Sequence, residues 1–337
     1  MKFTKLTEET FKNIKTKFYL DMQNANVPDE SKYHLEGDAW SHSMMVLSVA
    51  SEDFKSIALC HDLGKPLAKT FVDGKIRYSG HEGLSTILAS DYLTEDELYC
   101  VNYHGILWQK SPKQIRQMYS TKQGQKVLEA VVKFSEFDKK GNVSFDETNS
   151  KKTKSMEEVQ EVLKEILEAK YRDVEQTNRP TMYIMVGLPG SGKSTYIENN
   201  LKGIKVVSRD NALMEYGKSV GKTGTYSEVW ASLTDADQKE VDKKLQKDLS
   251  DAKRGSDDFI VDMTNLSWKS RKKQMNGLKN HRVEMIVFTT SLDTVVLRNA
   301  QRVGKTIPTK VLTDMAKRFE MPLYGENENI ENIKVVK

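Results

Sequence analysis

The chain has 337 residues, of which 38% are hydrophobic and 30% charged, and its formal net charge is +4. This composition is typical of a soluble globular protein with enough apolar residues for two hydrophobic cores. We expect no membrane span and no export, because the apolar runs are far shorter than the roughly 20 residues that cross a bilayer and the N-terminus lacks the apolar region of a signal peptide.

The first half of the chain predicts an all-α domain over residues 1–150. Apolar residues recur at intervals of three, four and seven, as on the buried face of a helix, in the segments 42–50, 53–63, 81–93, 95–104 and 124–138. Cys60 and Cys100 lie within these apolar segments. Buried reduced thiols are commoner there than a disulfide, which favours a cytoplasmic location.

Polar groups with metal-binding chemistry fall on the side that these helices bury. They are His42, His61, Asp62, His81, His104 and Asp138. A single histidine on an apolar face is usually an ordinary core residue. Several such groups together are hard to satisfy with neutral partners, because each unpaired buried polar group costs about 1 to 3 kcal/mol. Imidazole and carboxylate ligands without sulfur suit a divalent transition metal such as Mn²⁺, Fe, Co²⁺, Ni²⁺ or Zn²⁺.

Residues 151–178 are rich in Lys, Glu, Asn and Thr, and we interpret them as a linker. Ser155 followed by Glu158 resembles a capping box. The apolar residues after it repeat at helical spacing, which predicts one amphipathic helix inside the linker.

The second half, residues 179–337, predicts an α/β domain with a parallel sheet. Short β-type runs alternate with helical stretches, and the runs are residues 181–187, 204–208, 258–263 and 282–290.

The most specific motif is GLPGSGKST at residues 187–195, which follows a β-type run and precedes a helical one. Glycines turn backbone N–H groups toward phosphates, the lysine supplies a cation, and the serine hydroxyl can bind Mg²⁺. The pattern therefore predicts a P-loop that binds ATP and Mg²⁺. The residues that would do so are Gly187, Gly190, Gly192, Lys193, Ser194 and Thr195.

Two further features fit transfer of the terminal phosphate. Asp210 follows the next β-type run, where it could take a proton from an attacking hydroxyl or could serve only as a helix N-cap. Arg298 and Arg302, four residues apart, predict one basic helix face before a glycine. They could neutralise the transferred phosphoryl group or be ordinary solvated residues.

Residues 180–320 resemble the phage-type 5′-hydroxyl polynucleotide kinases over nearly their whole length, in the segments GLPGSGKST, SRD, VDMTNLSWKSRKK and VFTTSLDTVVLRNAQRVGKTIP. The resemblance implies that Lys193 and Ser194 act at the ATP phosphates and Mg²⁺, and that Asp210 is the general base. It also implies that Arg298 and Arg302 surround the phosphates.

The same resemblance suggests a supporting role for Asp262. One position departs from the family pattern. Where such kinases often carry an arginine for the substrate phosphate, three residues after the base, this chain has Leu213. The contact could come from Arg209 or from elsewhere.

Residues 30–145 resemble the HD-superfamily metal-dependent phosphohydrolases, and the segments ALCHDLGKP and GHEG carry the local resemblance. The resemblance implies a first metal held by His42, His61, Asp62 and Asp138, and a second held by His81 and His104 with Asp62 as the bridge. Asp62 would thus be catalytic, and Lys65 would lie near the phosphate. The remaining histidines, His34 and His281, fit no such pattern and are interpreted as ordinary residues.

An HD phosphohydrolase joined to a polynucleotide kinase resembles the HD-domain end-healing enzymes of RNA repair. The expected function is removal of a 2′,3′-cyclic, 2′- or 3′-phosphate from one end of broken RNA, or DNA, and phosphorylation of a 5′-hydroxyl. The chain has no KxDG motif, so sealing would fall to a separate ligase. Two alternatives stay open: a nucleotide-metabolism enzyme with a small-molecule kinase, and a regulatory protein with an ATP-gated switch.

Overall fold

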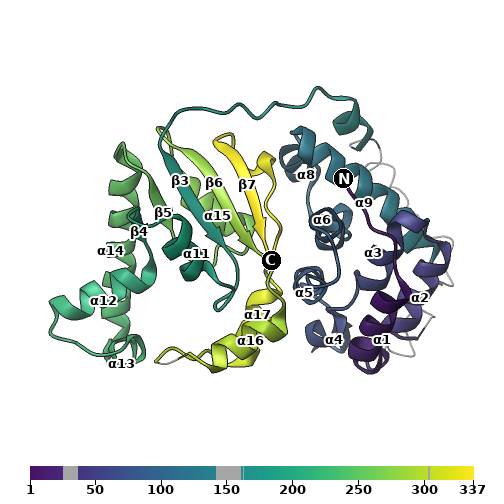
Figure 1. Cartoon of the computed structure of the whole chain (residues 1–337), viewed down its shortest axis with the longest axis horizontal. Helices are drawn as coiled ribbons and strands as arrows, with labels where there is room; N and C mark the ends of the chain where they lie inside the picture. Colours follow the sequence, from purple (N-terminus) through teal and green to yellow (C-terminus); the bar gives the residue numbers. More distant parts are fainter. Residues whose placement is uncertain (26–36, 142–160, 162, 303) are drawn as a thin grey trace. The chain divides into compact units, whose positions relative to one another are not determined.

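The computed structural model describes residues 1–25, 37–141, 161, 163–302 and 304–337 (Figure 1). They form two compact units. Unit 1 comprises Met1–Asp173 and Ala316–Gly325, and unit 2 comprises Val174–Met315 and Glu326–Lys337. The sequence-based limits of the domains and linker stay predictions.

Unit 1 is helical, as predicted. Its helices are α1 (Glu8–Gln23), α2 (Ala39–Val49), η1 (Glu52–Phe54), α3 (Lys55–Cys60), α4 (Lys65–Ala68), α5 (His81–Leu88), α6 (Glu95–Tyr103), α7 (Ile106–Gln109), α8 (Pro112–Met118) and α9 (Lys122–Lys140). Several begin at a hydroxyl or carboxylate N-cap, which satisfies free N–H groups of the first turn. Thr94 and Glu97 form a capping box at the start of α6. Glu97 is buried and also accepts hydrogen bonds from Thr4, which ties the N-terminal segment to α6.

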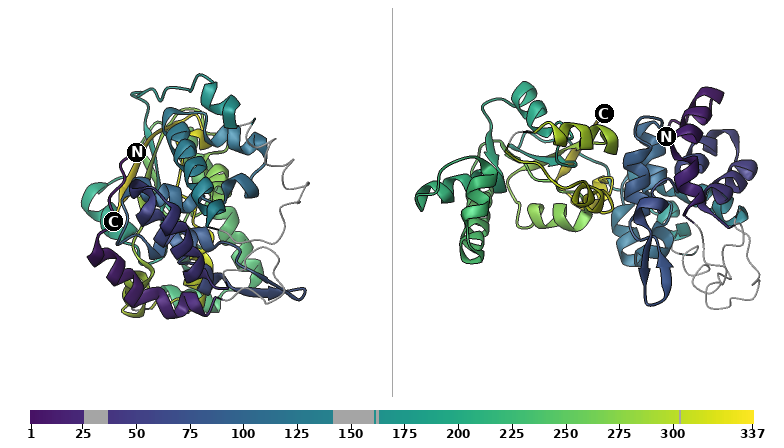
Figure 2. Two further views of the ribbon diagram at one scale, coloured as in Figure 1. Left: turned by 90° about the vertical axis from the view of Figure 1, so that its right-hand side faces the viewer. Right: turned by 90° about the horizontal axis from the view of Figure 1, so that it is seen from below.

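The unit also contains a β-hairpin that the helical reading did not predict, formed by β1 (Thr70–Val72) and β2 (Lys75–Arg77). The turn between them has positive φ at Asp73 and Gly74, and an Asp-Gly pair is a strong hairpin signal. The hairpin projects from unit 1 (Figure 2). Its strands are short and exposed, so they give almost no hydrophobic periodicity.

The linker helix is only partly within the described residues. Residues 161 and 163–168 are helical, with Leu163 and Ile166 buried, whereas Ser155 and Glu158 lie outside the described residues. Cys60 and Cys100 are buried and form no disulfide. No helix among the residues that the structure describes is both long and apolar enough to cross a membrane.

Residues 316–325 pack into unit 1 although they follow the second half's helices in sequence. Asn102 on α6 donates to the carbonyl of Phe319 over 3.0 Å and accepts from the N–H of Met321 over 2.8 Å. The Tyr99 hydroxyl donates to the carbonyl of Pro322 over 2.7 Å. A late segment of the chain is thereby bonded to the helix that ends beside His104.

Unit 2 has a five-stranded parallel sheet in the order β4-β5-β3-β6-β7. The strands are β3 (Thr181–Val186), β4 (Lys205–Val207), β5 (Phe259–Val261), β6 (Arg282–Phe288) and β7 (Ile330–Val336). The first four match the predicted β-type runs. The edge strand β7 was not predicted, because its sequence mixes charged and apolar residues, as edge strands commonly do.

The helices of unit 2 are α11 (Lys193–Asn200), α12 (Arg209–Ser219), α13 (Tyr226–Ser232), α14 (Asp235–Arg254), α15 (Trp268–Met275) and α16 (Leu292–Ala300), followed by α17 (Thr309–Ala316) and η2 (Tyr324–Glu326). In Figure 1, α11 lies in front of the sheet and α15 behind it. Met185, Ile260 and Ile286 form a buried cluster against which Ile197 of α11 packs. Because all strands run in one direction, the segments after them meet at one edge, where α/β proteins collect ligands.

Candidate active sites

The six predicted ligands of unit 1 come together from five helical elements. α2 carries His42, the turn after α3 carries His61 and Asp62, α5 begins at His81, α6 ends just before His104, and α9 carries Asp138. All but His81 and Asp138 are buried.

Asp62 lies between two groups of histidines. Its Oδ2 is 3.2 Å from Nε2 of His61 and 3.8 Å from Nε2 of His42, whereas its Oδ1 is 3.3 Å from Nε2 of His81 and 3.9 Å from Nε2 of His104. These residues form two possible metal-binding groups that share Asp62. Asp138 adjoins the first group, since its Oδ1 is 2.9 Å from Nε2 of His42 and 3.5 Å from Nε2 of His61.

Three of the rings are held in one tautomer by the backbone. Nδ1 of His61, His81 and His104 lies 2.7 to 2.9 Å from the carbonyl oxygen three residues earlier. Each Nδ1 therefore donates its proton to the backbone, so Nε2 is the ring atom that faces the cluster and could bind a metal. The Nε2 atoms of His81 and His104 are only 3.2 Å apart.

The residues present fit a divalent metal. Nε2 of His61 and both oxygens of Asp62 are buried and make no hydrogen bond to any described residue, although the ammonium of Lys65 forms an ion pair with Asp62 Oδ2 at 2.6 Å. Burial lowers the pKa of His61, but the carboxylates of Asp62 and Asp138 outweigh that effect and raise the pKa to about 10. The cluster thus attracts positive charge at this point, and a metal ion would supply it.

The glycine of HDLGK is required by close packing. An added Cβ at Gly64 would lie 2.3 Å from the carbonyl oxygen of His81 and 2.6 Å from Cβ of Leu84. The Gly64 N–H also donates to the hydroxyl of Ser85 over 2.9 Å. Without a side chain at Gly64, α5 can approach closely enough to bring His81 to Asp62.

In unit 2, residues 187–192 form the loop between β3 and α11. Gly187, Gly190 and Gly192 all have positive φ, between 83° and 158°, which glycine adopts readily. Lys193 donates to the carbonyls of Gly187 and Leu188 over 2.9 and 2.8 Å. Burial lowers the pKa of Lys193 to about 8, although Asp262 opposes the shift. Positive-φ glycines, a lysine and a helix N-terminus fit the phosphates of ATP.

Neighbouring loops hold the P-loop at the carboxyl edge of the sheet. The Gly187 N–H donates to the carbonyl of Thr264 over 3.0 Å, and the Asn265 amide donates to the carbonyl of Met185 over 2.9 Å. The fully buried Arg271 then donates to the carbonyls of Asn265 and Leu266, both over 3.1 Å.

Arg271 is held in turn by a buried carboxylate. Its guanidinium binds both oxygens of Glu326, with its Nε 2.8 Å from Oε2. This buried pair supports the loop that carries Asp262.

Asp210 is not a helix N-cap, so that alternative is wrong. The N-cap of α12 is Ser208, whose hydroxyl accepts from the N–H of Asn211. Asp210 lies two residues later with its carboxylate half exposed, where it contacts the ammonium of Lys305. Both Asp210 and Asp262 interact electrostatically with Lys193.

The two predicted arginines do not share a helix face. Arg298 lies on α16, and its guanidinium approaches the space that a Cβ on Gly192 would occupy. Arg302 lies beyond the end of α16. The helix ends there because the Asn299 side chain bonds to both backbone groups of Ile307 and turns the chain back. Arg302 still acts on Lys193, lowering its pKa.

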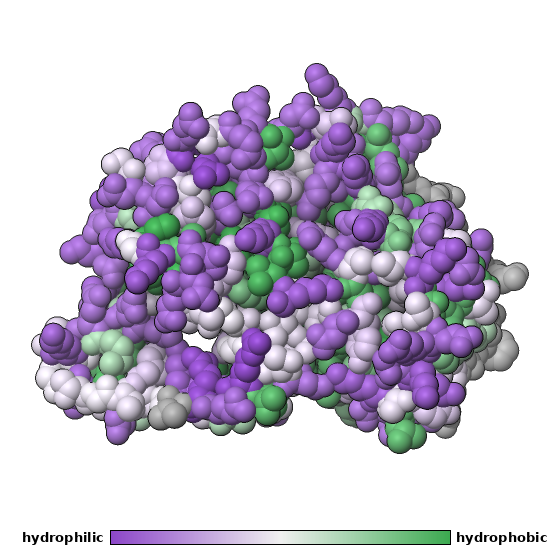
Figure 3. Space-filling view, in the orientation of Figure 1, coloured by the Kyte–Doolittle hydropathy of each residue, from purple (hydrophilic) through white to green (hydrophobic). Residues whose placement is uncertain are grey.

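The missing substrate arginine is not replaced by Arg209. That guanidinium donates to Asp242 over 2.9 Å and to Gln238 over 2.8 Å, and Leu213 is fully buried. The cation beside Asp210 is Lys305, which sequence reasoning missed. The sequence signal that could have identified Lys305 is the GKT triplet directly after Arg302 and Val303. Figure 3 shows unit 2 hollowed beside the corner that α12 and α13 form.

Comparisons with known proteins cover parts of the chain. Residues 182–322 match the family model of the AAA domain. The multifunctional CCA protein of Laribacter hongkongensis (strain HLHK9) is 44% identical over 62 residues, which are 17% of this chain and only 15% of that protein.

Two solved structures are similar at 20% identity. A chain of the Pnkp1/Rnl/Hen1 RNA repair complex matches with a TM-score of 0.35, over 44% of this chain and 46% of that chain. A gluconokinase from Sinorhizobium meliloti 1021 matches with a TM-score of 0.29, over 47% of this chain and 83% of that chain. The predicted fold class is confirmed: a helical N-terminal region and a C-terminal parallel sheet with an AAA/P-loop kinase domain at residues 182–322.

Proposed function

We propose that this protein is a nucleic-acid end-healing enzyme with two active sites. Unit 2 transfers the γ-phosphate of ATP to a 5′-hydroxyl polynucleotide end, and unit 1 removes a 2′,3′-cyclic, 2′- or 3′-phosphate. The observation that carries the proposal is a carboxylate near the P-loop lysine: Asp210 does not cap α12 and lies close enough to Lys193 to affect its pKa.

For the kinase, Asp210 would accept the proton of the 5′-hydroxyl. The hydroxyl oxygen would at the same time bond to the γ-phosphorus of ATP, and ADP would leave. Lys193, Arg298 and Arg302 would neutralise the charge that develops on the transferred group. The Ser194 hydroxyl would hold the Mg²⁺ that accompanies ATP.

For the phosphoesterase, one metal would be held by His42, His61, Asp62 and Asp138, and a second by His81 and His104 with Asp62 shared. Bound transition metals would supply an activated water and bind phosphate oxygens. Asp62 would orient both sites through its two oxygens. Lys65, whose ammonium lies 2.6 Å from Asp62 Oδ2, would bind a phosphate oxygen. The ends would be those of RNA or DNA, and a separate ligase would join them.

The test uses one RNA substrate that reports on both activities. An oligonucleotide with a 5′-hydroxyl and a 2′,3′-cyclic phosphate is incubated with ATP, Mg²⁺ and Mn²⁺, and both ends are scored. Phosphate gain at the 5′ end and loss at the 3′ end support the proposal. Activity on free nucleotides and small alcohols in place of both ends would instead favour the nucleotide-metabolism alternative.

A further inference from the structure

Lys305 connects the general-base carboxylate to an aromatic side chain. Its ammonium contacts the carboxylate of Asp210 and lies 3.9 Å from the ring centroid of Tyr226, a cation–π distance. The Lys305 side chain is 23% exposed, so a ligand can reach it. Burial raises the pKa of Tyr226, and the nearby Asp210 carboxylate raises it further.

Hydrogen bonds to the backbone of Gly304 hold the segment that carries Lys305 against the first turn of α13. The N–H of Ser227 donates to the carbonyl of Gly304 over 3.2 Å, and the Ser227 hydroxyl donates to the same oxygen. Gly304 has φ of 72°, and an added Cβ would lie 3.3 Å from Cβ of Thr225. Glycine is therefore favoured immediately before Lys305.

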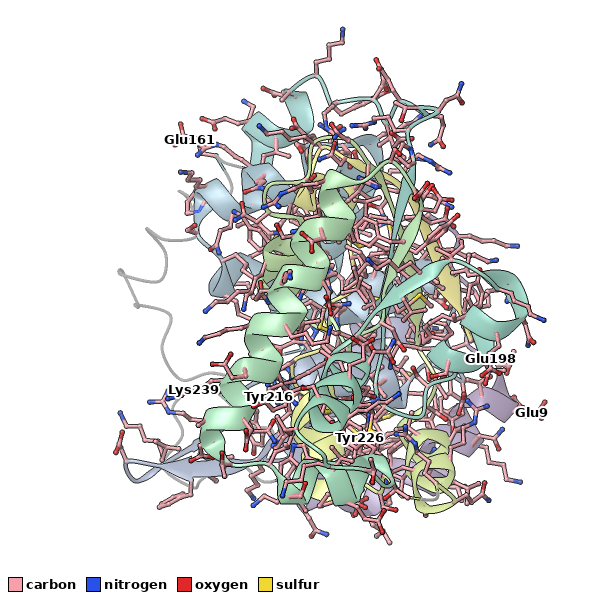
Figure 4. All side chains as sticks on the ribbon, turned by 90° about the vertical axis from the view of Figure 1, so that its left-hand side faces the viewer. Glu9, Glu161, Glu198, Tyr216, Tyr226 and Lys239 are labelled. Carbon is pink, nitrogen blue, oxygen red and sulfur yellow. The ribbon has the colours of Figure 1, made fainter. Side chains whose placement is uncertain are left out.

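α13 presents a second aromatic residue one turn beyond Tyr226. Positions i and i+4 of a helix lie about 6 Å apart along the axis and roughly 40° apart around it, so Tyr226 and Trp230 share one side. Val229 is buried and packs at Gly217 of α12, whereas Trp230 is 53% exposed. Figure 4 labels Tyr226, the first residue of α13, together with Tyr216 of α12.

We infer that Lys305, Tyr226 and Trp230 form the binding site for the acceptor strand, a deduction that rests on the proposed kinase function. Lys305 binds the phosphate that follows the 5′-terminal nucleoside. Tyr226 and Trp230 stack successive bases of a single-stranded end. The occupant is thus a polynucleotide rather than a small phosphorylated alcohol.

Two observations support a polynucleotide as the occupant: Lys305 can exchange Asp210 for a phosphate, and positive charge lies near α13. Lys305 contacts one oxygen of Asp210, and an incoming phosphate offers Lys305 a more highly charged partner, which would release that oxygen. Two further cations precede α13 in the chain: Lys218 lies in the last turn of α12, and Lys222 lies in the exposed segment that leads to α13. Aromatic faces combined with cations are the usual means of binding single strands without sequence preference. A small alcohol has no second base that could stack on Trp230.

The experiment compares acceptors of increasing length. Wild type and Trp230→Ala are assayed with 5′-hydroxyl acceptors of one to six nucleotides. Because stacking contributes about 1 to 3 kcal/mol per base, the substitution should raise KM between about 5-fold and 150-fold for acceptors of two or more nucleotides. The nucleoside 3′-monophosphate should change least, and Val311→Ala, an exposed apolar truncation on α17, should behave as wild type.

Lys305 is tested with acceptors that differ in one phosphate. Lys305→Gln should raise KM at least about 10-fold for a nucleoside 3′-monophosphate but not for the unphosphorylated nucleoside, and Lys305→Arg should restore most of the loss. Lys247→Gln, an exposed charge change on α14, is the matched control.

Binding of a 3′-fluorescein-labelled hexanucleotide, measured by anisotropy in the presence of ADP and Mg²⁺, needs no catalysis. Binding should weaken in Trp230→Ala and Lys305→Gln even if the protein shows no kinase activity. Failure of the proposed acceptor site is therefore distinguishable from failure of the proposed kinase function. Unchanged binding in both variants, or equal losses for every acceptor length, would overturn the proposed acceptor site.

Discussion

The Nε2 atoms of His81 and His104 face each other at 3.2 Å, and both rings donate their Nδ1–H groups to backbone carbonyls. Two neutral rings in this tautomer would direct their lone pairs at each other, which is repulsive. Burial and the neighbouring His81 and His61 lower the pKa of His104 to about 4, so a second proton is unfavourable there. A metal ion bound by both nitrogens would remove the repulsion.

The first prediction is that the protein as purified contains a transition metal that Asp62→Asn loses. Asp62 faces both histidine groups, so the change should remove most bound metal and abolish release of a terminal phosphate. Elemental analysis by mass spectrometry measures the metal. Asp91→Asn, a surface change in the same unit, is the control. Wild type that is metal-free and indifferent to chelator would contradict the assignment.

The second prediction is that the two activities separate. Lys193→Ala or Asp210→Asn should reduce phosphate transfer to a 5′-hydroxyl oligonucleotide by at least about 100-fold, because each removes a charge from the reacting centre. Release of 3′-phosphate should stay within about twofold of wild type. Asp62→Ala should have the reverse effects. Loss of both activities in one folded variant would contradict two independent sites.

The third prediction concerns ATP affinity and pH. Burial lowers the pKa of Lys193 to about 8, so below pH 8 the ammonium is charged and binds phosphate. Above pH 8 the free protein loses that proton, whereas bound phosphate favours retaining it. ATP affinity should therefore fall by up to about tenfold per pH unit above pH 8. Calorimetric titrations between pH 7 and 9.5 check this, and Lys193→Gln should bind weakly with a flatter pH profile.

The fourth prediction concerns the buried pair of Arg271 and Glu326. Removing one partner leaves a buried charge uncompensated, so Arg271→Met should destabilise unit 2 by about 3 to 5 kcal/mol. The double change Arg271→Met with Glu326→Gln should recover part of that loss. Thermal unfolding followed by circular dichroism measures both. An unchanged midpoint of thermal unfolding in Arg271→Met would show that the pair does not contribute to stability.

A fifth prediction tests close packing around the histidine and aspartate cluster of unit 1. Gly64→Ala would place a methyl group 2.3 Å from the His81 carbonyl oxygen, so α5 must move away. We expect lower metal content together with a destabilisation of about 1 to 3 kcal/mol. Gly74→Ala, in the hairpin turn where nothing lies within 4 Å of the added Cβ, should leave the metal content unchanged. Retention of full metal content in Gly64→Ala would contradict the packing argument.

The sequence determined the fold class and the main candidates for both sites. Helical periodicity, β-type runs and the GLPGSGKST motif depend on residues a few positions apart, so they can be recognised locally. The inward positions of the six candidate metal ligands follow from the same periodicity. The hairpin and β7 were missed because short, exposed or edge strands leave little periodic signal.

Only the tertiary structure decided which distant residues meet. Lys305 reaches Asp210 although 95 positions separate them, whereas Arg209, adjacent in sequence to Asp210, turns to Asp242. Arg302 lies beyond its helix because Asn299 turns the chain. These relationships arise where separate elements pack together, and the free energy of that packing depends on shapes and charges that no local pattern contains.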